Sequence, residues 1–128
     1  MGQKRILIVE DDTDLRRMFR TALAMAGYDI EEAGDGIDAL HVVENRTPDL
    51  IVLDLVLSAL DGVSVQQELA ARSLTSRIPI VVVTGSTINT DELPVARVLH
   101  KPVMPDELVR TVKQCLAHRP ATDLRPER

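Results

Sequence analysis

The segment Ile6-Leu7-Ile8-Val9-Glu10-Asp11-Asp12 places acidic residues directly after an apolar run, and Leu50-Ile51-Val52-Leu53-Asp54 repeats this arrangement. A short, continuous apolar run is typical of a β-strand that is covered on both faces. If the two strands are parallel neighbours, their C-terminal ends gather three or four carboxylates. Two unit charges about 5 Å apart repel by roughly 3 kcal/mol at an effective dielectric near 20. Such a cluster therefore indicates a hard cation, or a reaction that needs the acids.

Outward from these runs, strand and helix patterns alternate along the chain. Three further strands are predicted at residues 28–33, 80–83 and 97–99, and helical apolar spacing appears at 15–26, 37–44 and 62–72, with a last helix beginning at Pro105-Asp106. The segment between Thr84 and Lys101 is short and contains Pro94, which disfavours a helix interior. A helix there is expected to be brief, irregular or mobile.

This alternation predicts an α/β fold with a doubly wound parallel sheet, covered on both faces by right-handed crossovers. In such sheets the functional site lies outside the carboxyl ends of the strands, near the switch point in strand order. Asp11, Asp12 and Asp54 fall at that edge, as do Thr84 after the fourth strand and Lys101 after the fifth.

Composition excludes several classes of function. The 128 residues suffice for one domain, and the net charge of −5 with only Phe19 and Tyr28 as aromatic residues argues against a nucleic-acid surface. No apolar run approaches the roughly 18 residues of a membrane span. We expect no signal peptide, because no apolar h-region followed by a cleavage site is found near Met1. Because Cys115 is the single cysteine, a reducing compartment is favoured, and we expect a soluble, cytoplasmic protein. The polar tail at 119–128 is expected to be disordered.

Asp11-Asp12, Asp54, Asp61-Gly62, Thr84 and Lys101-Pro102, in this order, resemble the receiver domain of bacterial two-component response regulators. The resemblance covers nearly the whole chain and implies a receiver domain at 1–118. It also implies a flavodoxin-like (βα)5 sheet in strand order 2-1-3-4-5. By this resemblance Asp54 is the phosphoacceptor, Thr84 hydrogen-bonds the phosphoryl group and Lys101 pairs with it.

The resemblance further implies a Mg²⁺ site and protein partners. Asp11 and Asp12 would hold the ion together with Asp54 and the backbone carbonyl of Val56. The phosphoryl group would come from a histidine kinase or a phosphotransfer protein. The domain would catalyse only its own phosphorylation and dephosphorylation, and would signal to an unknown downstream protein as a monomer or weak homodimer. We expect output through protein contact, phosphate relay or a domain outside this sequence.

Several of these residues also have a plainer interpretation. Asp11 and Asp12 could cap the first helix, and Asp61-Gly62 could simply begin the third. The whole chain could be an interaction module that is never phosphorylated, although Asp54, Asp12 and Lys101 argue against this. A Mg²⁺-dependent phosphohydrolase with an aspartyl intermediate would carry an acid two residues after the nucleophile, where this chain has Val56.

The chain also departs from the receiver pattern on its fifth strand. Receivers usually carry an aromatic residue three positions before the lysine, and here that position is Val98. A valine has no large ring to swing inward on activation. The switch is therefore expected to work through a modified surface.

Overall fold

The computed structural model describes residues 2–85, 89–91 and 93–117, which form five strands and four helices. The strands are β1 (Arg5–Val9), β2 (Asp29–Ala33), β3 (Leu50–Leu53), β4 (Ile80–Thr84) and β5 (Arg97–His100). The helices are α1 (Thr13–Met25), α2 (Gly36–Asn45), α3 (Gly62–Ala71) and α4 (Pro105–Ala117). The strand and helix positions expected from the sequence are confirmed to within one or two residues at each end.

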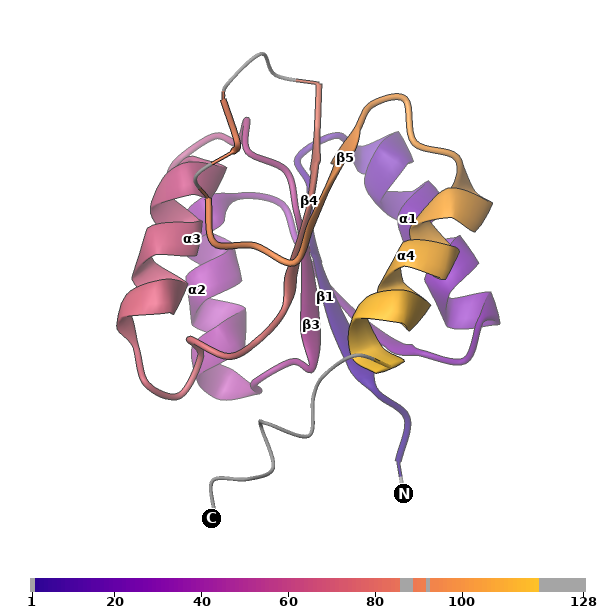
Figure 1. Ribbon diagram of the computed structural model, residues 1–128, viewed down its shortest axis with the longest axis horizontal. Coiled ribbons are helices and arrows are strands. Elements are labelled where there is room, and N and C mark those ends of the chain that lie inside the picture. Colours follow the sequence, from indigo (N-terminus) through magenta and orange to yellow (C-terminus); the bar gives the residue numbers. More distant parts are fainter. Residues whose placement is uncertain (1, 86–88, 92, 118–128) are drawn as a thin grey trace.

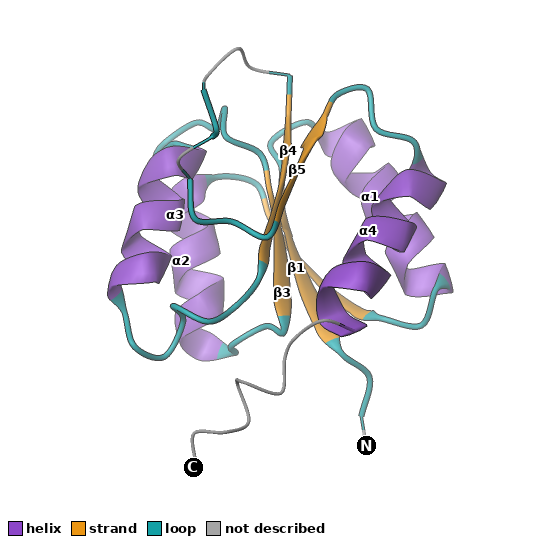
Figure 2. Cartoon of the chain, in the orientation of Figure 1, coloured by secondary structure: helices purple, strands orange, loops and turns teal. Residues whose placement is uncertain are grey.

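The five strands form one parallel sheet in the order β2-β1-β3-β4-β5, as the resemblance implied. Figures 1 and 2 show the sheet edge-on, with α2 and α3 covering one face and α1 and α4 the other. This three-layer arrangement explains the unbroken apolar runs of β1 and β3, because residues on both faces of these central strands are buried.

Two apolar cores fill the spaces between the sheet and its helices. One core joins alternate residues of the central strands, such as Leu7 and Ile51, to Val65 and Leu69 of α3. The other joins Ile8 and Val52 to the opposite helix layer. The alternation follows from strand geometry, in which successive side chains point to opposite faces.

Aspartate caps begin three of the helices at the carboxyl edge of the sheet. The side chains of Asp12, Asp35 and Asp61 each accept a hydrogen bond, of 2.8–2.9 Å, from the backbone N–H three residues further along. These caps satisfy backbone donors that a helix leaves unpaired. The plainer interpretation of Asp61-Gly62, as the start of a helix, is confirmed.

The crossover from β4 to β5 contains no helix among its described residues 85, 89–91 and 93–96. The backbone N–H of Leu93 donates to the carbonyl of Thr90, and the N–H of Val95 donates to the carbonyl of Leu93. The side chains of Leu93 and Val95 pack against the core. The irregular fourth helix expected from Pro94 is thus an irregular crossover in the part that is described. The expected disordered tail at 119–128 lies outside the described residues. No described helix combines the length and apolar character needed to cross a membrane.

Candidate functional site

The register of the central strands brings two acidic side chains to the same level of the sheet. Val9 of β1 pairs with Leu53 of β3, so Glu10 and Asp54 are both the first residues beyond their strands. Backbone hydrogen bonds keep the two residues in this position. The N–H of Asp54 donates to the carbonyl of Val9 at 3.0 Å, and the N–H of Glu10 donates to the carbonyl of Ala33 at 3.1 Å. Both side chains are buried, with 2% of Glu10 and 4% of Asp54 exposed.

Lys101 supplies the cation that faces these two carboxylates. Its Nζ lies 3.0 Å from Oδ2 of Asp54 and 3.1 Å from Oε1 of Glu10. Lys101 directly follows β5, and its backbone N–H donates to the carbonyl of Thr84 at 2.9 Å. The Lys101–Pro102 peptide bond is cis. The sequence expectation that Asp54, Thr84 and Lys101 meet at one edge is therefore matched by the structure.

Burial and the ion pairs shift the pKa values of Glu10 and Lys101. Burial raises the pKa of Glu10, and this outweighs the hydrogen bonds from Lys101 and the Asp12 backbone, which lower it. For Lys101, burial lowers the pKa, but the hydrogen bonds to Asp54 and Glu10 outweigh it and the pKa is raised overall. The lysine thus keeps its positive charge beside the acids.

Three carboxylates could hold a metal ion together. Glu10, Asp11 and Asp54 each offer an oxygen, and these atoms lie within 4.8 Å of one another. A cluster of carboxylate oxygens, with one exposed member in Asp11, is the donor set that Mg²⁺ prefers. The residues present therefore fit this ion.

Asp12 is not a member of this carboxylate group. Its Oδ1 accepts a hydrogen bond of 2.9 Å from Leu15 N–H and caps α1. The structure thus separates the expected pair, since Asp11 joins the cluster while Asp12 takes the capping role that the sequence left open. Glu10 is the acid that the sequence interpretation missed as a site residue.

The loop after Asp54 keeps that residue in a fixed orientation. The backbone N–H of Val56 donates to Oδ1 of Asp54 at 3.1 Å, while the Val56 side chain is more than half exposed. Gly62 at the start of α3 lies directly against the same backbone, since a Cβ atom there would be 2.3 Å from the carbonyl oxygen of Asp54. Its N–H donates to Leu55 at 3.0 Å. Asp54 is thus fixed from two sides.

Thr84 and Val98 lie on the neighbouring strands. Thr84 ends β4, is fully buried and pairs in register with His100 of β5. Val98 is partly buried and packs at the margin of the core that also contains Val82. The position on β5 where a typical receiver is expected to carry an aromatic ring thus holds an aliphatic side chain, which pairs in register with Val82, two residues before Thr84.

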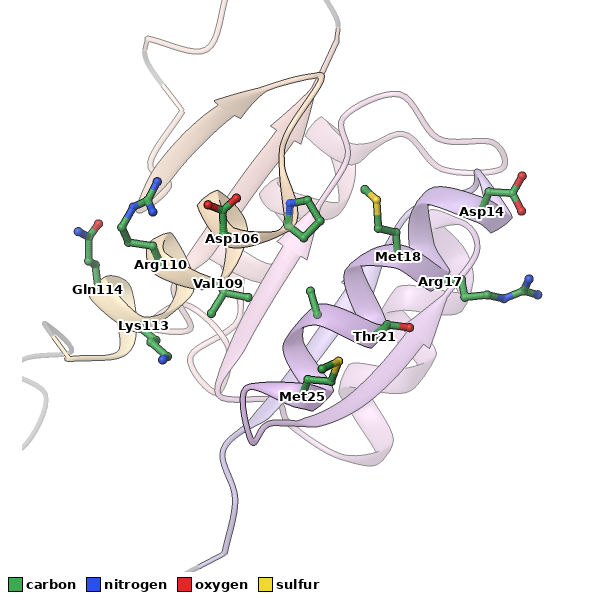
Figure 3. A pocket seen from close by; sticks show the side chains of 12 residues that line it. Asp14, Arg17, Met18, Thr21, Met25, Asp106, Val109, Arg110, Lys113 and Gln114 are labelled. Carbon is green, nitrogen blue, oxygen red and sulfur yellow. The ribbon is translucent and has the colours of Figure 1, made fainter.

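A groove of about 940 Å³ runs between α1 and α4 (Figure 3), and it is not lined by Glu10, Asp11 or Asp54. Its floor contains apolar side chains such as Met18, Ala22 and Val109, and charged residues including Arg17 and Lys113 lie along it. A smaller hollow of about 520 Å³ shares Met18 with the groove and extends to Lys101. The two hollows share Met18 and Pro105, and Lys101, which lines the second, is the residue that pairs with Asp54 and Glu10.

Comparisons with known proteins identify similarity to response regulators in both sequence and structure. Residues 6–113 match the family model for the response regulator receiver domain. The chain is 36% identical over 121 residues to the phosphate regulon transcriptional regulatory protein PhoB of Pseudomonas aeruginosa, covering 91% of this chain and 53% of that protein. It is 35% identical over 121 residues to the probable transcriptional regulator ycf27 of Porphyridium aerugineum, covering 91% and 49%. The chain spans about half the length of these curated relatives.

Solved structures share the fold over their whole length. A CheY-like receiver domain protein from Methanospirillum hungatei superposes with a TM-score of 0.85 at 27% identity, covering 92% of this chain and 97% of that one. The chemotaxis response regulator CheY4 of Vibrio cholerae gives 0.81 at 25% identity, covering 88% and 98%.

Proposed function

The chain belongs to the receiver domain family of response regulators, and from this membership we propose that it is a signalling switch phosphorylated on Asp54. The observation that carries the proposal is the buried Asp54 carboxylate, 3.0 Å from Lys101 and grouped with Glu10 and Asp11. Response regulators work with histidine kinases, so the donor is a phosphohistidine on a kinase or a phosphotransfer protein.

Transfer of the phosphoryl group to Asp54 is a simple displacement at phosphorus. An oxygen of the Asp54 carboxylate attacks phosphorus, a P–O bond forms, and the P–N bond to the donor histidine breaks. The departing imidazole nitrogen keeps the electron pair and takes up a proton. Because the attacking carboxylate and the phosphoryl group are both negative, catalysis consists mainly of positioning and charge neutralisation. Lys101 supplies one positive charge at this point.

Mg²⁺ supplies the remaining positive charge when it is bound. Glu10, Asp11 and Asp54 would hold it, together with the backbone carbonyl of Val56. The set differs from the one expected from the sequence, because Asp12 already caps α1 and is outside the carboxylate group. Lys101 then remains available to the phosphoryl oxygens.

Thr84 is proposed to bind the new phosphoryl group through its hydroxyl. Its backbone carbonyl accepts from Lys101, so a movement at one residue is passed to the other. Val98 has no ring that could swing inward on activation. We therefore propose that the β4–β5 crossover and the start of β5 carry the altered surface to a downstream protein.

The donor protein is proposed to dock along α1 and α4. The hollow that contains Met18 and Lys101 opens from the groove between these helices, and Met18 and Met104 are exposed. Methionine side chains adapt to varied partners. Arg17 and Lys113 on the groove would steer an acidic donor surface.

A direct test is the intact mass of the full chain after treatment with acetyl phosphate and Mg²⁺. The proposal predicts addition of one phosphoryl group to the wild type, none without Mg²⁺, and none in Asp54→Asn. An unmodified wild type would instead favour an interaction module that is not phosphorylated. No release of phosphate from an unrelated phosphoester is expected, because Val56 offers no acid two residues after Asp54.

A further inference from the structure

Arg16 connects the acidic site to the far edge of the sheet. From the second turn of α1, its Nη1 donates to the backbone carbonyl of Glu10 at 2.7 Å, and its Nε pairs with Oε1 of Glu32 at 3.0 Å. Its side chain is 20% exposed. Glu32 lies on β2, level with Ile8 of β1. One guanidinium therefore joins the site loop to a strand outside the site.

The carbonyl that Arg16 holds belongs to the peptide between Glu10 and Asp11. Because a peptide unit is planar, fixing that oxygen fixes the direction in which the chain leaves Glu10 and enters Asp11. Both residues are members of the carboxylate group. A hydrogen bond from a charged donor is among the stronger kinds, so this one can hold a turn whose side chains repel each other.

Arg20 provides a natural comparison one turn further along α1. Its Nε pairs with Oε2 of the same Glu32 at 3.2 Å, and its side chain is 57% exposed. The residue bonds Glu32 as Arg16 does, but no contact joins it to Glu10 in the described hydrogen bonds and ion pairs. Arg20 is thus the more exposed of the two arginines, and it shares the ion pair with Glu32 but lacks the bond to the acidic loop.

We propose that Arg16 is a positioning residue for the metal site, which orients the Glu10–Asp11 peptide so that the two carboxylates face Asp54. The inference rests on the proposed function, because that function requires Mg²⁺ at this site. The fork of the guanidinium is essential to this role, because one side chain must reach a carbonyl and a carboxylate at once. A lysine would keep the charge and lose one of the two bonds.

The test is a Mg²⁺ titration of the ¹⁵N-labelled full chain by NMR, with Arg16→Met, Arg16→Lys and the matched Arg20→Met. Loss of an outer-shell contact typically weakens metal binding about tenfold or more, so about that loss is expected in Arg16→Met. Arg16→Lys should lose at least about threefold on the same reasoning. Arg20→Met should bind Mg²⁺ as the wild type does, because Arg20 makes no contact with Glu10 in the described hydrogen bonds and ion pairs.

Wild-type Mg²⁺ affinity in Arg16→Met would overturn the inference, and so would equal losses in Arg16→Met and Arg20→Met. If Arg16→Met does not fold, Arg16→Lys decides, and wild-type affinity in that variant overturns the role of the fork. Failure of the proposed function gives a different result, because the wild type itself would then neither bind Mg²⁺ nor accept a phosphoryl group.

Discussion

The ammonium group of Lys101 lies 3.0 Å from Asp54 and 3.1 Å from Glu10, so one cation serves two buried carboxylates. Lys101→Met leaves both acids without that partner. Breaking a buried hydrogen-bonded pair in this way is expected to lower the free energy of unfolding by about 1–3 kcal/mol at pH 8. It should also slow phosphorylation by acetyl phosphate at least about tenfold. Urea unfolding and intact-mass time courses measure the two effects.

The stability loss in Lys101→Met should depend on pH. Burial already raises the pKa of Glu10, and removal of the lysine takes away an interaction that lowers it. An acid with a raised folded-state pKa favours folding below its unfolded pKa of about 4.3, and that contribution is lost as pH rises through the folded value. The deficit of the variant should therefore be large at pH 8 and smaller at pH 5. Equal deficits at the two pH values would contradict this account of Glu10.

The two adjacent aspartates should separate by function. Asp11→Asn removes a charge from the carboxylate group and is expected to weaken Mg²⁺ binding about tenfold or more. Asp12→Asn should bind Mg²⁺ nearly as the wild type does, because asparagine still caps a helix. Asp12→Ala should lose about 1 kcal/mol of stability with its cap. Weaker Mg²⁺ binding in Asp12→Asn than in Asp11→Asn would return the metal site to the pair expected from the sequence.

Gly62 should tolerate no side chain, because it lies directly against the backbone of Asp54. A Cβ atom there would lie 2.3 Å from the carbonyl oxygen of Asp54 and 2.5 Å from Cα of Leu55. Gly62→Ala is expected to cost about 1–3 kcal/mol of stability and to slow phosphorylation, since Asp54 must move. Gly85→Ala is the matched control, because its Cβ would meet Lys101 at an ordinary 3.7 Å. Thermal unfolding of both variants measures the difference.

Docking through Met18 can be separated from the chemistry at Asp54. Met18 lines both the groove and the hollow that extends to Lys101. Met18→Asp should slow phosphoryl transfer from a phosphorylated histidine phosphotransfer protein about tenfold, while the small donor acetyl phosphate reacts at the wild-type rate. Leu74→Asp, at an exposed residue outside the groove, serves as the control. Equal slowing with both donors would mean that Met18 acts on the site itself.

The fold could be read from the sequence because its signals are local. Unbroken apolar runs such as Leu50–Leu53 mark buried strands, and the acidic caps Asp35 and Asp61 mark helix starts. The placement of Asp54 and Lys101 followed from one rule, that parallel strands end at the same edge of the sheet.

The acidic cluster was harder because it depends on register. Glu10 and Asp12 both carry a carboxylate, and both lie near the end of β1, so the sequence alone does not distinguish them. Only the pairing of Val9 with Leu53 places Glu10, rather than Asp12, level with Asp54. The usable signal was position, since Glu10 and Asp54 are each the first residue after an apolar run. The irregular crossover around Leu93 and Val95 was predictable only in outline, because its path depends on packing against the distant core.

That crossover has a consequence for how pathways stay apart in a cell that contains several receivers. The described residues between β4 and β5 hold Leu93 and Val95 against the sheet without a helix. A target protein whose binding site fits a helix would find none in the described part of this crossover. Poor fit to other receivers' targets is one of the ways in which a binding surface discriminates. We expect the irregular crossover to weaken binding of this receiver to the targets of its relatives and to favour a target whose binding site fits the irregular backbone.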